Sequence, residues 1–394
     1  MTTAGSPSRS KLARGAHSLA DRNFERILLI KPSSLGDVIH ALPVLRGMRR
    51  KYPRARIDWL ISSSLAPLLE DHPDISELIR FDRRRFGRMA TSPRIAGEFL
   101  SFLRGLRRRE YDLVVDLQGL FRTGLLAAAT GAPVRIGFRA AREGAWLFYT
   151  DRLAPRDSDT HAVDRNYLVA EMLGFDDSPI EFPLHLTDAD RAEARHLLNQ
   201  WDVAGGSNLL AVAPAARWET KVWPPERFAE AMRAIQHQDD AQVVLLGGPA
   251  ESEICRRIAS LCTPPPLNLA GRTNLRTLAA IIERADTTLC LDSGVMHLAV
   301  ALDRPLVCLV GPTNPRRTGP YNRPLDVLRL DLDCAPCYFR RLSQCPYEHR
   351  CMRDLPVQLV ADAVLARLRS ARTPRELGNP DVTHWPASRG VWYD

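Results

Sequence analysis

A stretch late in the chain, residues 286–313, combines residue types that can bind a phosphate anion. Asp292, Ser293 and Gly294 break a short β-branched apolar run, and a segment with helical spacing follows. A helix starting here presents free N–H groups and the positive end of its dipole, which suits a diphosphate. Gly294 lets the anion approach, Ser293 can donate its hydroxyl, and His297 lies one turn further on. The other interpretation is that Ser293 only caps the helix and His297 packs in the core.

The loop of residues 31–37, read KPSSLGD, brings a carboxylate to the start of another predicted helix. It lacks both the Gly-Lys-Ser/Thr ending of a Walker loop and the glycine triplet of dinucleotide-binding folds. Asp37 stays ionised at this position, because the helix dipole and the free N–H groups favour the anion. It can therefore accept a proton from a hydroxyl group as a general base. The alternative is that Asp37 only caps the helix.

Two cations and an acid follow predicted strands in the second half of the chain. Arg217 and Lys221 lie four residues apart in one loop, where they can neutralise a leaving diphosphate. A solvated basic loop, with Trp223 packed beneath it, is the alternative. Glu251 follows a strand that ends in two glycines, from where a carboxylate can bind ribose hydroxyls. Glu251 is also favourable simply as an acid in a first helical turn.

Four of the eight cysteines form a compact late set: Cys334, Cys337, Cys345 and Cys351. A C-x2-C pair is typical of zinc sites, but the second pair is spaced more loosely than in a zinc ribbon. The set is therefore either a structural zinc site or a group of plain buried thiols, and we assign it no catalytic role. Two D-x-D patterns, which recur in metal-dependent sugar transfer, lack the expected strand and loop, so we interpret them as solvated carboxylates.

Charge and hydrophobicity bound the class of protein. The length of 394 residues favours two domains, and a hydrophobic share of 45% is ample for real cores. The formal net charge of +8 predicts acidic partners such as nucleic acid, a membrane surface or phosphorylated ligands. Basic clusters lie at residues 80–88 and 104–109. No nucleic-acid module or aromatic interleaving accompanies them, so nucleic acid is not expected as a partner.

The amino-terminal residues do not resemble a targeting segment. Residues 1–22 are polar and basic without an apolar stretch, and no later stretch is apolar for long enough to cross a bilayer. The protein is therefore expected in the cytoplasm. A reducing compartment favours thiols or metal ligands over disulfides.

Strand-like and helix-like segments alternate along most of the chain, which predicts parallel α/β layers. Buried strands are expected at 27–30, 56–61, 78–81, 111–117 and 134–138, and again at 209–213, 243–246, 287–291 and 306–310. A helix over 38–50 contains Pro43, which should shorten or kink its first turns. The pattern indicates two Rossmann-like, doubly wound domains whose strand ends face a central cleft.

Breaks in this pattern set the expected domain boundaries. The amino-terminal domain should span 23–204 and the carboxyl-terminal domain 205–355. A helix at 356–372 should follow, and loose tails are expected at 1–22 and 373–394.

Several motifs in order carry a resemblance to a known family. The motifs are KPSSLGDVIHALPVLRGMRRKYP, PAARWETKVWP, LLGGPAE, LAGRTNLRTLAAIIERAD, LDSGVMHLAVALDRPLVCLVGPTNP and CAPCYFRRLSQCPYEHRCM. With these motifs, the chain resembles glycosyltransferase family 9, the bacterial lipopolysaccharide heptosyltransferases, over roughly residues 27–368. The resemblance implies a GT-B fold that binds the acceptor in the first domain and the sugar nucleotide in the second. It also implies inverting transfer of heptose from ADP-heptose to the lipopolysaccharide inner core, with no required cofactor and no catalytic metal.

The resemblance also implies roles for individual residues. Asp37 matches the family's proposed base, Lys221 the lysine that contacts donor phosphates, and Glu251 the glutamate that binds ribose. The remaining matches are Asp292, Ser293, Gly294 and His297 in the donor loop, and Lys31, Ser33, Ser34 and Gly36 in the acceptor-side loop. One departure is that Ala216 and Arg217 stand where the best-known members often carry hydroxyl residues, so Arg217 is expected to replace those hydroxyls with charge.

The expected partners follow from this resemblance and from the basic segments. They are a nucleotide-sugar donor, an anionic lipid A-core acceptor, and the inner-leaflet membrane surface, where the helix at 93–109 and the arginines near Arg84 can dock. Two alternatives stay open. The protein is a family 9 enzyme with another nucleotide sugar or acceptor, or a GT-B sugar-nucleotide enzyme that transfers nothing, such as an epimerase.

Overall fold

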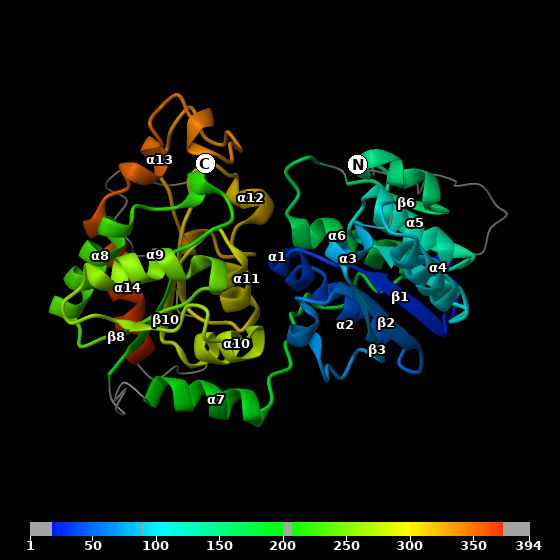
Figure 1. The fold of residues 1–394 in the computed structure, drawn as a ribbon, viewed down its shortest axis with the longest axis horizontal. Coiled ribbons are helices and arrows are strands. Elements are labelled where there is room, and N and C mark those ends of the chain that lie inside the picture. Colours follow the sequence, from blue (N-terminus) through cyan, green and yellow to red (C-terminus); the bar gives the residue numbers. More distant parts are fainter. Residues whose placement is uncertain (1–17, 89, 156, 200–206, 373–394) are drawn as a thin grey trace, which may run out of the picture.

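Two parallel β-sheets organise the computed structural model, which describes residues 18–88, 90–155, 157–199 and 207–372. They lie side by side with helices around each (Figure 1). The predicted tail at 373–394, most of the tail at 1–22 and most of the predicted interdomain break lie outside the described residues.

The first sheet has six parallel strands in the order β3-β2-β1-β4-β5-β6. The chain moves outward to one edge from β1 and then to the other edge from β4, so the sheet is doubly wound. Its strands are β1 (Arg26–Ile30), β2 (Arg56–Ser62), β3 (Glu77–Phe81), β4 (Leu113–Asp116), β5 (Val134–Phe138) and β6 (Asp151–Leu153).

The second sheet repeats this plan with the order β12-β11-β10-β7-β8-β9, all parallel. Every residue of β7 and β10 is buried, which explains their continuous apolar character, because helices cover both faces. The strands are β7 (Leu209–Ala213), β8 (Gln242–Leu245), β9 (Leu267–Asn268), β10 (Thr287–Leu291), β11 (Leu306–Leu309) and β12 (Val327–Leu328).

Helices fill the connections between strands. In the first half these are α1 (Leu35–Ile39), α2 (Leu42–Lys51), α3 (Arg83–Phe86), α4 (Pro93–Arg107), α5 (Phe121–Ala129), α6 (Ala162–Leu173) and α7 (Asp188–Asn199). In the second half they are α8 (Pro225–Gln238), α9 (Ser252–Ser260), α10 (Leu275–Arg284), α11 (Gly294–Ala301), α12 (Pro315–Thr318), α13 (Arg350–Arg353) and α14 (Val357–Arg372).

The helix predicted over 38–50 is divided into α1 and α2, which confirms the effect expected of Pro43. Proline has no N–H to donate, so it is tolerated only in a first helical turn, and it occupies that turn of α2. The division leaves α1 as a short separate helix that starts directly after the KPSSLGD loop.

The hydrophobic core does not stop at the division between the two sheets. One cluster of buried side chains includes Leu29 and Ile57 of the first sheet together with Leu209 and Cys290 of the second. Helix α7 lies along α10 beneath the second sheet (Figure 1). The two halves are therefore packed against each other through apolar contacts.

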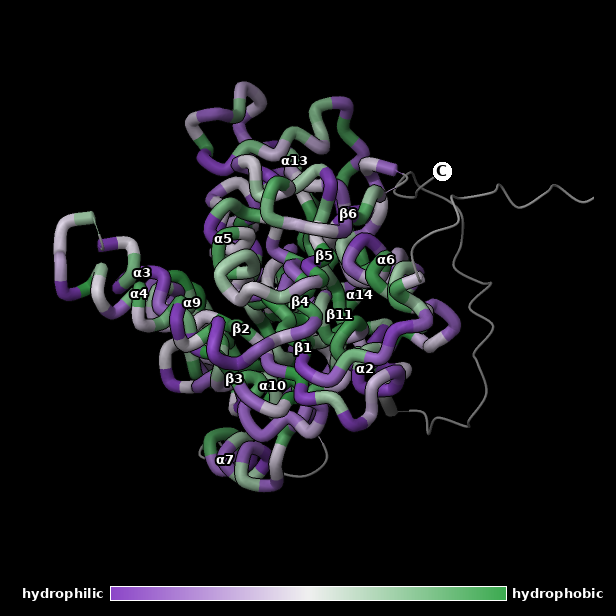
Figure 2. The backbone as a smooth tube through the Cα atoms, turned by 90° about the vertical axis from the view of Figure 1, so that its right-hand side faces the viewer, coloured by the Kyte–Doolittle hydropathy of each residue, from purple (hydrophilic) through white to green (hydrophobic). Residues whose placement is uncertain are grey.

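A basic arm projects from the first half. Figure 2 shows α3 and α4 extending away from the body of the molecule. Its base is held by a cluster of aromatic rings: Phe81, Phe86, Phe99 and Phe102. Within the described ranges, no helix combines the length and the apolar character that crossing a bilayer requires.

Candidate functional site

The candidate residues come from loops at the carboxyl ends of the central strands. The KPSSLGD loop follows β1, the Arg217–Lys221 loop follows β7, and the Asp292–Gly294 turn follows β10. Strand order reverses between β1 and β4 in one sheet and between β10 and β7 in the other. Ligands of doubly wound sheets bind in the crevice at such reversals. The fold therefore collects the predicted residues at the two reversal points.

Helices α1 and α11 bring these two groups of loops into contact across the junction of the halves (Figure 1). Gly294, at the first position of α11, faces Leu35 of α1 so closely that an added Cβ would meet Leu35 Cδ2 at 2.6 Å. The first turn of each helix thus lies against the other.

Asp37 lies in α1 and is partly exposed. Its Oδ2 accepts hydrogen bonds from the Ser34 N–H at 3.0 Å and the Ser34 hydroxyl at 2.7 Å. Burial works to raise the pKa of Asp37, but the nearby Lys31 ammonium and the Ser34 donors outweigh it and hold that pKa well below its ordinary value. The group is an ionised carboxylate at neutral pH, and it also caps its own helix.

Lys31 is a buried cation in the first half, with 2% of its surface exposed. Its Nζ donates to the Leu117 carbonyl at 2.8 Å and lies 3.3 Å from Asp37 Oδ1. Burial lowers the pKa of Lys31, and the Asp37 carboxylate opposes that effect. The remaining residues of the acceptor-side loop are close by: the Ser33 N–H donates to the Gln118 side chain at 3.4 Å, and Gly36 is buried.

Lys221 and Asp292 form a buried ion pair in the second half. Lys221 Nζ donates to Asp292 Oδ2 at 2.7 Å and to the Asp292 carbonyl at 3.2 Å. The Thr313 hydroxyl donates to the same Oδ2 at 2.6 Å. The Lys221 ammonium also makes a cation–π contact with the Trp218 ring, 4.6 Å from its centroid. The Arg340 guanidinium lies 4.9 Å from the same centroid. The structure thus brings two predicted residues together, and Lys221 enters the site already paired.

Ser293 and His297 flank the start of α11. The Ser293 hydroxyl is buried and has no hydrogen-bond partner among the described residues, so simple side-chain capping does not account for it. The His297 ring is buried and its Nδ1 lies 2.9 Å from His40 Nε2. Burial lowers the pKa of His297 to about 4, against the opposing effect of Asp292.

Two predicted residues, Arg217 and Glu251, form no hydrogen bond or ion pair with this centre among the described residues. Arg217 is exposed. Glu251 accepts a hydrogen bond from the Gly248 N–H at 2.7 Å and so closes the turn after β8. Glu251 is therefore engaged locally, as the simpler interpretation expects, in a turn at the same edge of the sheet as the loops after β7 and β10.

The cysteine-rich segment supports the loop that carries Lys221. The Glu219 N–H donates to the Arg340 carbonyl at 3.1 Å, and the Leu342 N–H donates to Glu219 Oε2 at 3.1 Å. All eight cysteines are free thiols. Burial raises the pKa of Cys351 to about 11, with the neighbouring thiols adding to the effect. Among the described residues, no group of three or more His, Cys, Asp or Glu side chains is arranged to hold a metal ion.

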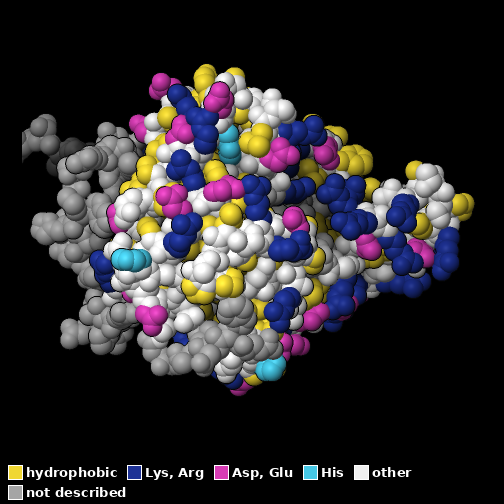
Figure 3. Space-filling view, turned by 60° about the vertical axis from the view of Figure 1, so that its left-hand side comes forward, with side chains coloured by type: hydrophobic (Ala, Val, Ile, Leu, Met, Phe, Trp, Pro, Cys, Tyr) yellow, Lys and Arg dark blue, Asp and Glu magenta, His cyan; other side chains and the backbone are white. Residues whose placement is uncertain are grey.

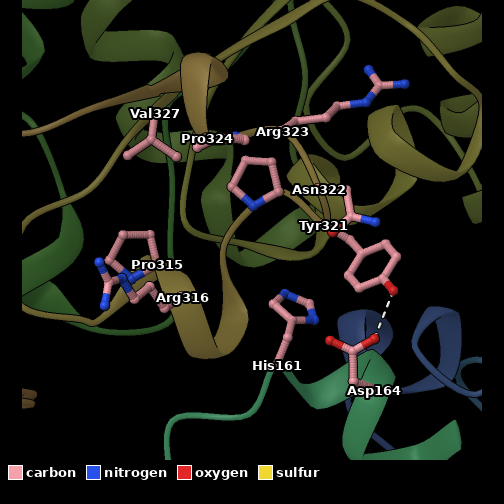
Figure 4. Close-up of a pocket in the computed structure, with 10 residues that line it drawn as sticks. His161, Asp164, Pro315, Arg316, Tyr321, Asn322, Arg323, Pro324 and Val327 are labelled. Carbon is pink, nitrogen blue, oxygen red and sulfur yellow. Dashed lines mark hydrogen bonds between the residues drawn. The ribbon is translucent and has the colours of Figure 1, made fainter. Parts of the chain in front are cut away.

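Sequence reasoning missed several residues at this junction, among them His40 and Thr313. It also missed a cavity of about 430 Å³ that draws residues from both halves (Figure 4). There, the Tyr321 hydroxyl donates to Asp164 at 2.6 Å, and the His161 ring packs at a tilt against the Tyr321 ring, with centroids 5.0 Å apart. Contacts between such distant parts of the chain leave no local pattern in a sequence.

Comparison with known proteins agrees with this geometry. The family model for glycosyltransferase family 9 (heptosyltransferase) matches residues 99–348. The chain is 31% identical over 349 residues to the lipopolysaccharide core heptosyltransferase OpsX of Haemophilus influenzae, covering 87% of this chain and 96% of that protein. It is 32% identical over 330 residues to lipopolysaccharide heptosyltransferase 1 of Pseudomonas aeruginosa, covering 82% and 89%.

A known structure shows the same architecture. The ADP-heptose lipopolysaccharide heptosyltransferase II of Escherichia coli superposes with a TM-score of 0.70 at 26% identity, covering 88% of this chain and 99% of that one. The predicted fold class, two Rossmann-like sheets in a GT-B arrangement, is confirmed. The chain belongs to glycosyltransferase family 9, and it is a glycosyltransferase.

Proposed function

We propose that this protein transfers heptose from ADP-heptose to the lipopolysaccharide inner core, with inversion at the anomeric carbon. The observation that carries the proposal is an ionised acid, Asp37, on one side of a junction and an anion-binding turn, Ser293–Gly294, on the other. The names of the relatives, which are lipopolysaccharide heptosyltransferases, support the same donor and acceptor class. We assign acceptor binding to residues 23–204 and donor binding to residues 205–355.

In the proposed reaction, Asp37 takes the proton from an acceptor hydroxyl. The acceptor oxygen forms a bond to the anomeric carbon from the face opposite the diphosphate, and the bond from that carbon to the phosphate oxygen breaks. ADP leaves with the electron pair, and the proton stays on Asp37. The free N–H groups at the start of α11, the Ser293 hydroxyl and the Lys221 ammonium stabilise the negative charge that grows on the diphosphate.

Arg217 is the feature that bears on donor choice. It is exposed in the loop after β7, on the same loop as Lys221, so it is free to swing onto a bound diphosphate. We assign Glu251, in the turn after β8, to accept a hydrogen bond from a ribose hydroxyl once it releases the Gly248 N–H. The reaction requires no metal in this scheme, because the cations are protein side chains.

A direct test is to incubate the purified protein with lipid A-core acceptor and a panel of nucleotide sugars, and to measure release of the free nucleoside diphosphate. We expect release from ADP-heptose that depends on the acceptor, and a product of inverted anomeric configuration by NMR. Acceptor-dependent release from another nucleotide sugar would redirect the donor assignment. Conversion of the donor with no acceptor consumed would indicate the epimerase-type alternative.

We also propose that the protein works at the inner leaflet of the cytoplasmic membrane, docked through the α3–α4 arm. Figure 3 shows Lys and Arg side chains gathered on this projecting arm. Arg84 and Arg88 are exposed there, and Leu100 of α4 is half exposed on the same arm. Each arginine near an anionic surface contributes on the order of 1 kcal/mol, so a cluster suffices for reversible docking.

Vesicle flotation tests the docking proposal. Wild-type protein should float with vesicles that contain anionic phospholipid and should remain in the bottom fraction when the vesicles are neutral. The charge reversals Arg84→Glu and Arg88→Glu together should abolish flotation, while Arg256→Glu, an exposed reversal on α9 of the other half, should not. Equal loss in both variants would remove the arm from the docking surface.

A further inference from the structure

One hydrogen bond joins the two halves of the molecule beside the proposed reaction centre. His40, directly after α1, lies with Nε2 at 2.9 Å from Nδ1 of His297 in α11. The rings meet edge to face, with centroids 4.2 Å apart, and only 4% of His40 and 8% of His297 is exposed. The Asn166 side chain donates to the His40 carbonyl at 3.2 Å and so fixes its backbone. The pair is thus buried and held from the first half.

Two glycines make this close approach possible. An added Cβ on Gly36 would lie 2.3 Å from Cδ2 and 2.7 Å from Nε2 of His297, so the ring occupies the space that a side chain would fill. Gly36 of α1 and His40, which caps the carboxyl end of that helix in helical conformation, are four residues apart and so lie on one face. Gly294 of α11 leaves the matching space for Leu35. We call these five residues (Leu35, Gly36, His40, Gly294 and His297) the α1–α11 clasp.

The electrostatic surroundings keep both rings of the clasp neutral. Burial lowers the pKa of His40 well below its ordinary value, with further lowering from His297 and an opposing effect of Asp37. The charged and titratable groups that act on the two rings are Lys31, Asp37 and His161 around His40, and Asp37, His161, Lys221 and Asp292 around His297. A single proton between two neutral rings is enough for the observed bond, and either nitrogen can carry it.

The clasp also adjoins the two groups proposed to take part in the reaction. Asp37 follows Gly36 in the same short helix, and Gly294 of the proposed anion-binding turn is itself a clasp residue, three positions before His297 in α11. A displacement at His40 therefore changes the distance between the carboxylate on one side and the bound diphosphate on the other. Misplacing reacting groups by about 1 Å can cost on the order of 100-fold in rate.

We propose that His40 is a positioning residue for sugar transfer. Through its bond to His297 it seats the donor loop of the second half against the helix that carries Asp37, without contacting either substrate. The predicted effect of His40 on sugar transfer rests on the proposed function. The predicted effect of His40 on the packing of the two halves does not, and it can be measured separately.

The test compares His40→Ala with His40→Gln and with a matched control. We expect His40→Ala to lower kcat about 100-fold while leaving KM for the donor within about threefold. His40→Gln, whose amide can take the place of Nε2, should recover at least a tenth of the wild-type kcat. The control is His72→Ala, which removes a histidine equally buried in the first half and bonded to Pro183 and Asp74 instead, and it should keep kcat near wild type.

Small-angle X-ray scattering gives a readout that does not depend on catalysis. The His40→Ala protein should have a larger radius of gyration than wild type, with and without ADP. Gly36→Ala should expand the protein as well, because the new methyl group displaces the His297 ring although alanine suits a helix. The wild-type protein should loosen as the pH falls from about 6.5, the ordinary histidine value, towards 4, because the open form then binds the extra proton more tightly.

The outcomes separate the two proposals. Unchanged scattering in both His40→Ala and Gly36→Ala, or a loss of kcat no greater than that of His72→Ala, would overturn the role of His40. A wild-type protein that transfers no heptose, but whose scattering responds to His40→Ala and Gly36→Ala as described, would refute the proposed reaction and leave the clasp standing as one of the contacts that hold the two halves together.

Discussion

Removal of Lys221 should expose how strongly the donor loop depends on one buried ion pair. Lys221 and Asp292 are 14% and 7% exposed at the side chain, and the Nζ–Oδ2 distance is 2.7 Å. At an effective dielectric constant of about 20, this distance corresponds to an attraction of roughly 6 kcal/mol, which desolvation of both charges offsets in large part. Deleting one partner of a buried pair typically costs about 3–5 kcal/mol.

The lower end of that range applies to Lys221→Met, because Asp292 keeps the Thr313 hydroxyl as a donor at 2.6 Å. We expect a loss of about 3 kcal/mol of unfolding free energy. At roughly 2–4 °C per kcal/mol for a domain of this size, the second half should melt about 6–12 °C lower by calorimetry. The double variant Lys221→Met with Asp292→Asn removes the stranded carboxylate charge and should recover about 2 kcal/mol of the loss.

Affinity for ADP provides the second measurement on the same variants. A charge-assisted hydrogen bond contributes about 1.5–3 kcal/mol, so Lys221→Met should weaken ADP binding by roughly 10- to 100-fold in titration calorimetry. A double variant that melts as low as Lys221→Met would refute the view that an unpaired carboxylate causes the instability. Unchanged ADP affinity would place the diphosphate away from Lys221.

Three further results are expected. Asp37→Asn should lower transfer by about 100- to 10,000-fold and leave ADP affinity unchanged. Burial works to raise the pKa of Asp37, but Lys31 holds that pKa low. The wild-type transfer rate should therefore show no loss from this group as the pH falls from 8 to 5. Arg276→Ala should cost about 3 kcal/mol of unfolding free energy, because Arg276 donates to Asp190 at 2.7 Å and to the Glu70 carbonyl at 2.7 Å, which ties α10 to the first half. Burial works to raise the pKa of Asp190, but Arg276 brings it down to about 2, so this stabilisation should be complete above about pH 4 and lost as the pH falls towards 2 in acid titrations of stability. Dialysis against EDTA should leave transfer unchanged, and a fall in rate together with loss of a bound metal found by elemental analysis would contradict the metal-free scheme.

The distribution of apolar residues predicted the fold well, because parallel strands that are buried on both faces appear in a sequence as continuous apolar runs. Each of the nine expected strands is present, with each end within two residues of the expected one. The three that were missed, β6, β9 and β12, are two or three residues long, too short to show a period. Their positions at the sheet edges explain why so little sequence suffices to form them.

Placement of the candidate loops could also be predicted, because the carboxyl ends of parallel strands share one edge of a sheet. Their side-chain partners could not. The His40–His297 bond joins residues 257 apart in the chain, and Thr313 reaches Asp292 from the loop after another strand. Nothing within a local window records such contacts, since they arise only when two separately built sheets pack together.

The pairing of Lys221 with Asp292 changes how the site must attract its donor. In the sequence, Lys221 and Asp292 lie in different loops, and each suggests a separate function. In the structure their charges cancel at 2.7 Å, so the pair by itself offers a diphosphate no net positive charge. Part of the attraction must then come from the N–H groups at the start of α11 and from the Ser293 hydroxyl, which has no partner among the described residues, with the exposed Arg217 as an additional cation on the same loop as Lys221. Neutralising Asp292 alone should therefore tighten ADP binding, because it releases Lys221 to the phosphates. Weaker ADP binding to Asp292→Asn would instead mean that the carboxylate holds the ammonium in the one position from which it can reach them.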